Sequence, residues 1–193
     1  DISDEAVIFY KKLQTVINSI DNRLELRGRD SLGLSIQIIS DGKEKKVDIF
    51  ERSKISIHKL KYKKKNIYNF TFKTSSSIGE LGDNAKKIIN SIKNCEQLSQ
   101  LINNSHIENA SIMAHTRWAS VGDVNLINTH PITLWGNGNK NHTSGILNGD
   151  IYNYEALIEK AKNRHAMQYN KKIATDCLVI PATIVNEKTF NER

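Results

Sequence analysis

The sequence predicts a mixed α+β fold, because it contains both helix-like and strand-like patterns. Residues 9–24 and 85–102 carry apolar side chains at the three- and four-residue spacing of amphipathic helices. Short runs between residues 34 and 72 alternate apolar with polar side chains, which is typical of antiparallel strands with one solvated face. A chain of 193 residues is long enough to bury a core of its own. We therefore expect a single domain over residues 1–193.

The N-terminal segment predicts a helix, a tight turn and a strand. Ser3 is a candidate N-cap, and Asp4 and Glu5 place negative charge in the first turn, where it favours a helix. Residues 27–31 read Arg-Gly-Arg-Asp-Ser and predict a polar turn. Residues 34–39 follow as a strand.

Residues 41–84 are expected to form a Lys-rich segment of antiparallel strands. Asp41-Gly42 predicts a hairpin turn, and alternating runs follow at residues 47–49, 55–57 and 68–72. The second amphipathic helix comes next, over residues 85–102, with Cys95 inside it as a small core residue.

The positive charge of the chain is concentrated in this region. Residues 43–65 include ten Lys or Arg and three Asp or Glu, so they account for the whole net charge of +7. Such a segment is a phosphate-binding or docking patch in one interpretation and a solvated hairpin in the other. We favour the solvated hairpin and expect no nucleic-acid partner. A nucleic-acid-binding domain would instead predict salt-sensitive affinity that depends on Lys59 to Lys65.

The segment at residues 114–122, Ala-His-Thr-Arg-Trp-Ala-Ser-Val-Gly, is the strongest candidate for a ligand site. It follows an apolar run at residues 107–113 that predicts a buried strand, and sites are commonly built on loops that leave such strands. Arg117 can bind a carboxylate through two parallel N–H bonds. The alternative is a surface pair in which Arg117 stacks on Trp118 without any ligand.

The remaining elements are short. In chain order we expect an extended piece at 130–132, a loop at 136–144, a strand at 144–147, a helix after the capping residue Asn153, and a helix that starts at Thr175-Asp176. Pro181 should kink or shorten the last helix. Asn148-Gly149, at the end of the predicted strand, is either a common turn sequence or a pair of hydrogen-bond donors for an oxyanion.

Composition limits the other classes of function. No apolar run is long enough to span a bilayer, and no signal-peptide pattern is present, so we expect a cytoplasmic protein without a membrane partner. The two cysteines, Cys95 and Cys177, form neither a disulfide framework nor a metal set. We expect reduced thiols, no metal and no cofactor. The charge of Asp176 should raise the pKa of Cys177, which makes this thiol a poor nucleophile.

Four segments, taken in order, resemble the class II (N-terminal nucleophile) glutamine amidotransferases, above all the glutaminase domain of glutamine:fructose-6-phosphate amidotransferase. The segments are residues 23–31, residues 115–120 (His-Thr-Arg-Trp-Ala-Ser), Leu147-Asn148-Gly149 with the following helix, and Thr175-Asp176. The resemblance covers almost the whole chain except residues 41–84, which we expect to be an insertion. It implies a four-layer α-β-β-α sandwich of mainly antiparallel sheets. It also implies hydrolysis of L-glutamine to glutamate and ammonia, with ammonia passed to an acceptor, a sugar phosphate, in a separate domain of the sugar-isomerase type.

The resemblance also implies a role for each matched residue. Arg117 would hold the α-carboxylate of glutamine, Asp176 its α-ammonium, and Trp118 and Ser120 would line that end of the pocket. Asn148 and Gly149 would stabilise the tetrahedral oxyanion. Arg27 would brace the N-terminus. Ser120 stands where close relatives carry Thr, and Val121 stands where they carry His.

The nucleophilic cysteine of this family has no counterpart, because residue 1 is Asp. The chain as printed is therefore expected to be inactive in glutamine hydrolysis, and to lack the first central strand and the C-terminal end of the sandwich. We expect the cysteine to lie upstream of Asp1 and the protein to form a homo-oligomer through its acceptor domain. The rival hypothesis is a catalytically inactive glutamine-binding or regulatory module that retains Arg117 and Asp176.

Overall fold

The computed structural model describes residues 3–43, 47–51, 54–76, 80–118, 123–136, 141–164, 167 and 169–185. Its elements in chain order are α1 (Asp4–Ser19), a π-helical turn (Ile20–Leu24), a 3-10 turn (Glu25–Arg27), β1 (Ser31–Ser40), β2 (Phe50–Glu51), β3 (Ile55–Tyr62), β4 (Lys65–Ser75), α2 (Asp83–Lys93), α3 (Glu96–Asn104), β5 (Ile107–Arg117), β6 (Ile132–Trp135), β7 (His142–Gly145), α4 (Tyr154–Arg164), a second 3-10 turn (Asp176–Leu178) and α5 (Val179–Ile184).

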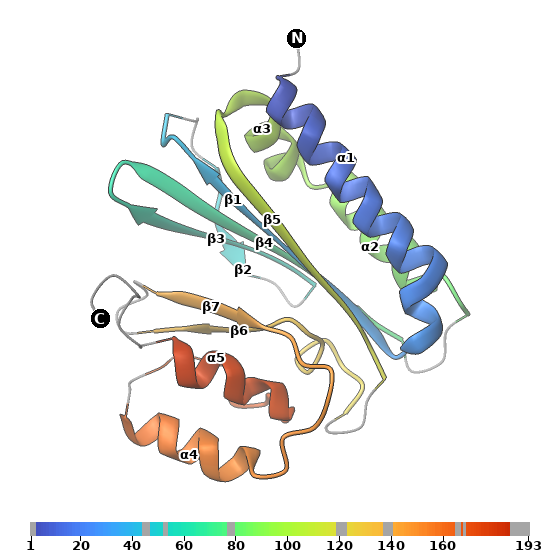
Figure 1. The fold of residues 1–193 in the computed structure, drawn as a ribbon, viewed down its shortest axis with the longest axis vertical. Helices are drawn as coiled ribbons and strands as arrows, with labels where there is room; N and C mark the ends of the chain where they lie inside the picture. Colours follow the sequence, from blue (N-terminus) through green and yellow to red (C-terminus); the bar gives the residue numbers. More distant parts are fainter. Residues whose placement is uncertain are drawn as a thin grey trace.

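These elements lie in four layers in the order helix, sheet, sheet, helix (Figure 1). A five-stranded sheet in the order β2-β3-β4-β1-β5 is covered on one face by α1, α2 and α3. A two-stranded sheet, β6-β7, lies against its other face and carries α4 and α5 on the outside. All strand pairs are antiparallel. The predicted α+β class with mainly antiparallel sheets is confirmed.

The main core lies between the five-stranded sheet and its helices. Alternate residues of the two central strands point to this face and are fully buried: Leu32, Leu34, Ile36 and Ile38 on β1, and Tyr68, Phe70 and Phe72 on β4. Phe9 and Leu13 of α1 pack against them, as the helical spacing predicts. The side chain of Ser3 accepts a hydrogen bond from the amide of Ala6 at 3.2 Å, so Ser3 is the N-cap of α1.

The region expected to be an insertion is part of this core. It supplies β2, β3 and β4, and β4 pairs with β1 over ten residues, from Ser31 with Ser75 to Ser40 with Asn66. The expected hairpin at Asp41-Gly42 is wrong, because both partners of β1 are strands further along the chain, β4 and β5. The expected strand at residues 47–49 is also wrong, and the short strand β2 comes directly after it.

Two other boundaries differ from the prediction. The helix expected over residues 85–102 is broken into α2 and α3, and Cys95 lies between them as a buried residue. Residues 114–117, expected in a loop, belong to β5, which is the edge strand of its sheet. Most of β5 is only half-buried, so the expected buried strand is wrong in this respect.

The C-terminal elements begin close to the predicted positions. β7 ends at Gly145, whereas the strand was expected at residues 144–147. The helix start at Thr175-Asp176 is confirmed, as a 3-10 turn that continues into α5. Pro181 lies in the first turn of α5, where a missing N–H is tolerated.

The layer between the two sheets is rich in polar side chains. Asn69 of β4 donates to the hydroxyl of Ser35 at 3.1 Å, and the ring of His58 lies 4.8 Å from that of Trp135, centroid to centroid. The two layers approach closely at Gly33, where a Cβ atom would lie 1.7 Å from the carbonyl oxygen of His130. Only glycine allows this approach.

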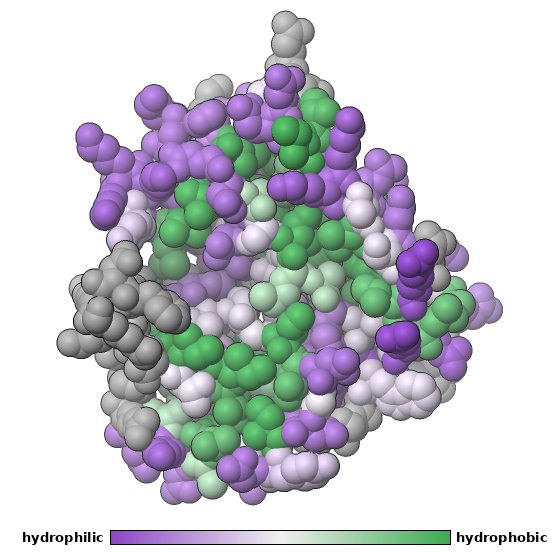
Figure 2. Space-filling model, in the orientation of Figure 1, coloured by the Kyte–Doolittle hydropathy of each residue, from purple (hydrophilic) through white to green (hydrophobic). Residues whose placement is uncertain are grey.

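The surface shows where the lysines are concentrated. The end of the β3–β4 hairpin, at the upper left of Figure 2, is hydrophilic and carries the exposed residues Lys61, Lys63, Lys64 and Lys65. Lys65 forms an ion pair with Glu108, and the ammonium of Lys63 lies 5.3 Å from the centroid of the Tyr62 ring. Among the described residues, no helix combines the length and apolar character that crossing a membrane requires.

Candidate functional site

Most of the predicted site residues line one cavity of about 400 Å³. It lies where the end of β5, the turn before β1, the loop after β7 and the start of the last 3-10 turn meet. Six of the predicted residues line it: Arg27, Arg117, Trp118, Asn148, Gly149 and Asp176. Ser120 lies outside the described residues. Segments separated by up to about 150 positions therefore face one volume, which is the arrangement that a ligand site requires.

Arg117 is the cation of the cavity. It is the last residue of β5, where it pairs with Ser31 at the start of β1, and only 5% of its surface is exposed. Its Nη1 donates to the carbonyl oxygen of Asp123 at 3.4 Å. Burial lowers the pKa of its guanidinium, while the charges of Asp30 and Asp176 oppose this shift. An arginine remains charged in such a position, so the cavity holds a largely desolvated cation.

Gly28 determines how closely the turn before β1 approaches this arginine. A Cβ atom at this position would lie 2.7 Å from the carbonyl carbon of Arg117 and 2.9 Å from the amide nitrogen of Trp118. The amide of Asp30 donates to the carbonyl oxygen of Arg117 at 3.1 Å. The glycine in the Arg-Gly-x-Asp-Ser turn is therefore required by the packing of two backbones.

Asp176 is the buried anion of the cavity, with 5% of its surface exposed, whereas Asp150 lines the cavity as an exposed residue. Oδ2 of Asp176 accepts from the amide of Ile151 at 2.8 Å, and its Oδ1 accepts from the amide of Cys177 at 2.9 Å and from the hydroxyl of Thr175 at 3.3 Å. A carboxylate can accept about four hydrogen bonds. These three bonds fix the group in place and leave acceptor capacity on Oδ2 for a ligand donor.

His130 is a positioning residue for Asp176, although the sequence did not single it out. It is 4% exposed, its Nδ1 accepts from the amide of Leu147 at 3.5 Å, and its Nε2 lies 3.4 Å from the hydroxyl of Thr175. The tautomer follows from this network: Nε2 donates to Thr175, which in turn donates to Asp176. Burial lowers the pKa of His130 to about 3, so the ring is neutral.

His115 is the second residue of the cavity to which the sequence assigned no role. Its ring lies 4.6 Å from that of His130, centroid to centroid, and burial lowers its pKa. Its Nδ1 is buried without a partner among the described residues. His115 belongs to the His-Thr-Arg-Trp segment, so its place in that segment could have indicated a role at the site. For His130, the only feature in the sequence was its position before Pro131.

The other predicted residues lie at the rim. Trp118 is 76% exposed, and Arg27, Asn148 and Gly149 are also exposed. The rim residues can therefore reach a ligand from the solvent side. The charged residues Arg117 and Asp176 lie deeper in the cavity.

Neither cysteine has the properties of a nucleophile. Burial and the adjacent charge of Asp176 raise the pKa of Cys177 to about 12, as expected in direction, and its Sγ donates to the carbonyl oxygen of Gly145 at 3.4 Å. Burial also raises the pKa of Cys95, which lies between α2 and α3. In the described part of the chain, no three His, Cys, Asp or Glu residues are grouped so that they could hold a metal ion.

Comparisons of the chain with protein-family models, with curated proteins and with solved structures give no match. The geometry of the cavity, a buried cation and a buried anion facing one volume with donors at the rim, suits a small zwitterion.

Proposed function

We propose that this cavity binds free L-glutamine and that the chain is the glutaminase domain of a class II amidotransferase. The reaction would release glutamate and ammonia, and the ammonia would pass to a sugar phosphate in a separate domain. The observation that carries the proposal is that Arg117 and Asp176, each 5% exposed, line the same cavity. The four-layer order of helices and sheets agrees with an N-terminal nucleophile hydrolase sandwich.

Recognition of a free amino acid is the step that these residues would perform. The α-carboxylate would pair with the guanidinium of Arg117, which can donate two parallel hydrogen bonds. The α-ammonium would donate to Oδ2 of Asp176. Truncating one partner of such a desolvated charge pair typically costs 2–5 kcal/mol or more, because the other charge is left buried and unpaired. Amides that lack either charge would therefore bind weakly.

Hydrolysis would require two further components. The side-chain amide would extend toward Asn148 and Gly149, whose amide groups would donate to the oxyanion of the tetrahedral intermediate. A thiolate must attack the amide carbon and release ammonia, and water must then cleave the resulting thioester. Cys95 and Cys177 are both buried with raised pKa values. We propose that the nucleophile is a cysteine upstream of Asp1.

The binding half of the proposal is tested by titrating L-glutamine calorimetrically into the wild type and into the variants Arg117→Ala and Asp176→Asn. We expect each variant to bind at least about thirtyfold more weakly, which corresponds to about 2 kcal/mol. Arg23→Ala is the matched control, since Arg23 is exposed and does not line the cavity. Unchanged affinity in both site variants would remove the cavity from the proposal.

A second candidate function is a glutamine-sensing module that binds glutamine without hydrolysis, because Cys95 and Cys177 are both buried with raised pKa values. Measuring glutamate release by the full-length protein separates the two candidates. The amidotransferase predicts glutamate release that Asp176→Asn lowers by reducing glutamine binding. The sensing module predicts the same loss of binding with no glutamate release in the wild type.

A further inference from the structure

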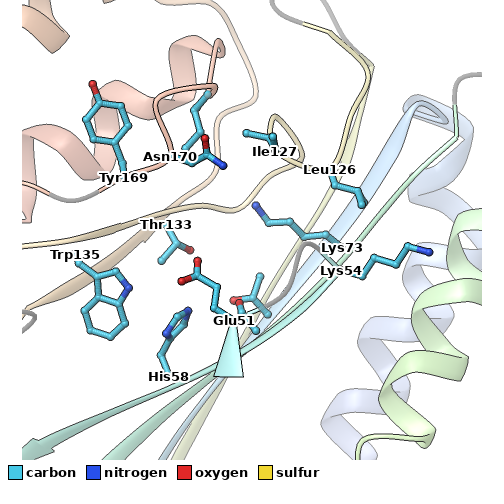
Figure 3. A pocket seen from close by; sticks show the side chains of 13 residues that line it. Glu51, Lys54, His58, Lys73, Leu126, Ile127, Thr133, Trp135, Tyr169 and Asn170 are labelled. Atoms are coloured by element: carbon cyan, nitrogen blue, oxygen red, sulfur yellow. The ribbon is translucent and has the colours of Figure 1, made fainter. Parts of the chain in front are cut away.

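A second cavity, of about 520 Å³, lies between the two sheets (Figure 3). None of its lining residues belongs to the first cavity. Its walls come from β2, β3 and β4 on one side, and from β6 and the segments 126–127 and 169–173 on the other. The volume falls within the range of about 300–1,000 Å³ that is typical of small-molecule sites.

Lys73 of β4 is the cation of this second cavity. Its ammonium points into the cavity, whereas that of Lys54, on the same wall, points away (Figure 3). Burial lowers the pKa of Lys73 to about 8, which leaves the side chain mainly charged at pH 7. Within the described ranges, no carboxylate forms an ion pair with it. The charge of Glu51 acts on Lys73 from the same cavity but forms no ion pair with it, so this half-buried ammonium can still pair with the anionic group of a ligand.

The other polar groups favour a ligand that also carries hydrogen-bond donors. Glu51 directs its carboxylate into the cavity near Thr133 (Figure 3). The hydroxyls of Thr71 and Thr133 and the amide of Asn170 add partners that both donate and accept. Burial lowers the pKa of His58, so its ring is neutral and does not compete with Lys73 for an anion.

The apolar part of the cavity wall can pack against the uncharged part of a ligand. Trp135 of β6 and Tyr169 supply aromatic rings, and Leu126, Ile127 and Ile173 supply aliphatic surface. The indole of Trp135 is held by the ring of His58 at 4.8 Å between centroids. A fixed aromatic surface beside a half-buried lysine suits a small anionic molecule with an apolar body.

We propose that this inter-sheet cavity is a second ligand site for a small molecule bearing a phosphate or carboxylate group. Its anion pairs with Lys73, its hydroxyl or amino donors face Glu51, and its body packs on Trp135. The site is independent of the function proposed for the first cavity.

The experiment uses Trp135 as the reporter. The chain has two tryptophans, so Trp118→Phe leaves Trp135 as the only one. In this background, phenyl phosphate and benzoate are titrated separately while tryptophan fluorescence is recorded. The probe with the lower dissociation constant identifies the preferred anionic group. We expect saturable binding of at least one probe. Lys73→Met should weaken it at least tenfold, and Lys54→Met should leave it unchanged. Absence of saturable binding by either probe, or equal loss in both lysine variants, would overturn the proposal.

Thermal unfolding distinguishes a lysine that binds a ligand from one that stabilises the fold. Lys73→Met removes a desolvated charge while keeping the aliphatic length, so we expect its melting temperature to equal or exceed that of the wild type. A lower melting temperature would mean that Lys73 already has a stabilising partner, which contradicts the proposal. Lys73→Gln provides the same binding test if the methionine variant does not fold.

Discussion

At the scale of single residues, Gly28 shapes the first cavity although it has no side chain that could contact a ligand. Its missing Cβ allows the turn before β1 to lie against the backbone of Arg117 and Trp118. The same contact places Arg27 at the rim of the cavity. One hydrogen atom in place of a methyl group thus sets the distance between two segments of the site.

Gly28→Ala should therefore affect both stability and binding. The new Cβ would meet the backbone of Arg117 at 2.7 Å, which flexible side-chain movement cannot relieve. We expect a loss of about 3 kcal/mol in the free energy of unfolding, at the upper end of the usual cost of overpacking, together with weaker glutamine binding. Urea unfolding and calorimetry measure the two effects. A variant of wild-type stability and affinity would show that the turn does not need this contact.

The charged residues of the site could be predicted from sequence, whereas the histidine that positions one of them could not. Arg117 lies in a segment whose residue types are compatible with a carboxylate site, and Asp176 was assigned its role through the resemblance to the amidotransferases. His130 acts through Leu147 and Thr175, which are 17 and 45 positions away. No local pattern encodes contacts between such distant positions.

At the scale of elements, Asn84 joins the turn that carries Arg27 to helix α2. Its side-chain amide donates to the carbonyl oxygen of Arg29 at 2.7 Å, and its Oδ1 accepts from the hydroxyl of Thr74 at 3.2 Å. Its backbone amide donates to Oε1 of the buried Glu25 at 3.1 Å. This residue therefore anchors the start of α2 to two other elements.

Asn84→Ala should cost about 2 kcal/mol, because it leaves the carbonyl of Arg29 and the hydroxyl of Thr74 without this partner. Asn90→Ala is the matched control, since Asn90 lies on the same helix but is exposed. Chemical denaturation of both variants makes the comparison. Equal stability of the two variants would mean that the hydrogen bonds of Asn84 contribute nothing measurable.

Helices and long strands could be predicted from their periodicity. The order of the strands in the sheet and the positions where helices are interrupted could not. The buried apolar residues of α1 and β4 recur at regular spacing, which correctly predicted a helix and a strand. The break between α2 and α3 falls at Asn94-Cys95, where no Gly or Pro marks it. The hairpin expected at Asp41-Gly42 followed a local turn signal, whereas the pairing of β1 with β4 and β5 depends on the whole sheet.

At the scale of the whole molecule, buried histidines lie where the two sheets meet. His130 packs against His115 beside the first cavity, with Arg117 and Lys73 as the other charges that act on it. His142 on β7 lies 5.5 Å from His58 on β3, ring to ring, and its Nε2 is buried without a partner among the described residues. Burial lowers the pKa of His130 to about 3 and that of His142 to about 4.

These pKa values predict a loss of stability in mild acid. In the unfolded chain a histidine takes up a proton near pH 6.5, but in the folded protein these two rings remain neutral well below that pH. The unfolded state therefore binds more protons as the pH falls, which lowers the free energy of unfolding. We expect a loss of about 2 kcal/mol per histidine between pH 7 and pH 5.

Urea unfolding at several pH values checks this expectation with a matched pair of variants. His142→Gln should flatten the pH dependence, because it removes one of the two rings. His106→Gln should leave it unchanged, since His106 is exposed. A wild-type stability that stays constant from pH 7 to pH 5 would show that these rings do not stay neutral in the folded protein.

The proposed site depends on recognition of both charges of one amino acid, by Arg117 and by Asp176. The most direct measurement compares L-glutamine with glutaramate, which is glutamine without its α-amine, as ligands of the wild type and of Asp176→Asn. We predict that the substitution weakens glutamine binding at least about thirtyfold and leaves the weaker binding of glutaramate unchanged. An equal loss for both ligands would mean that Asp176 does not contact the α-ammonium, and the proposed site would then be wrong.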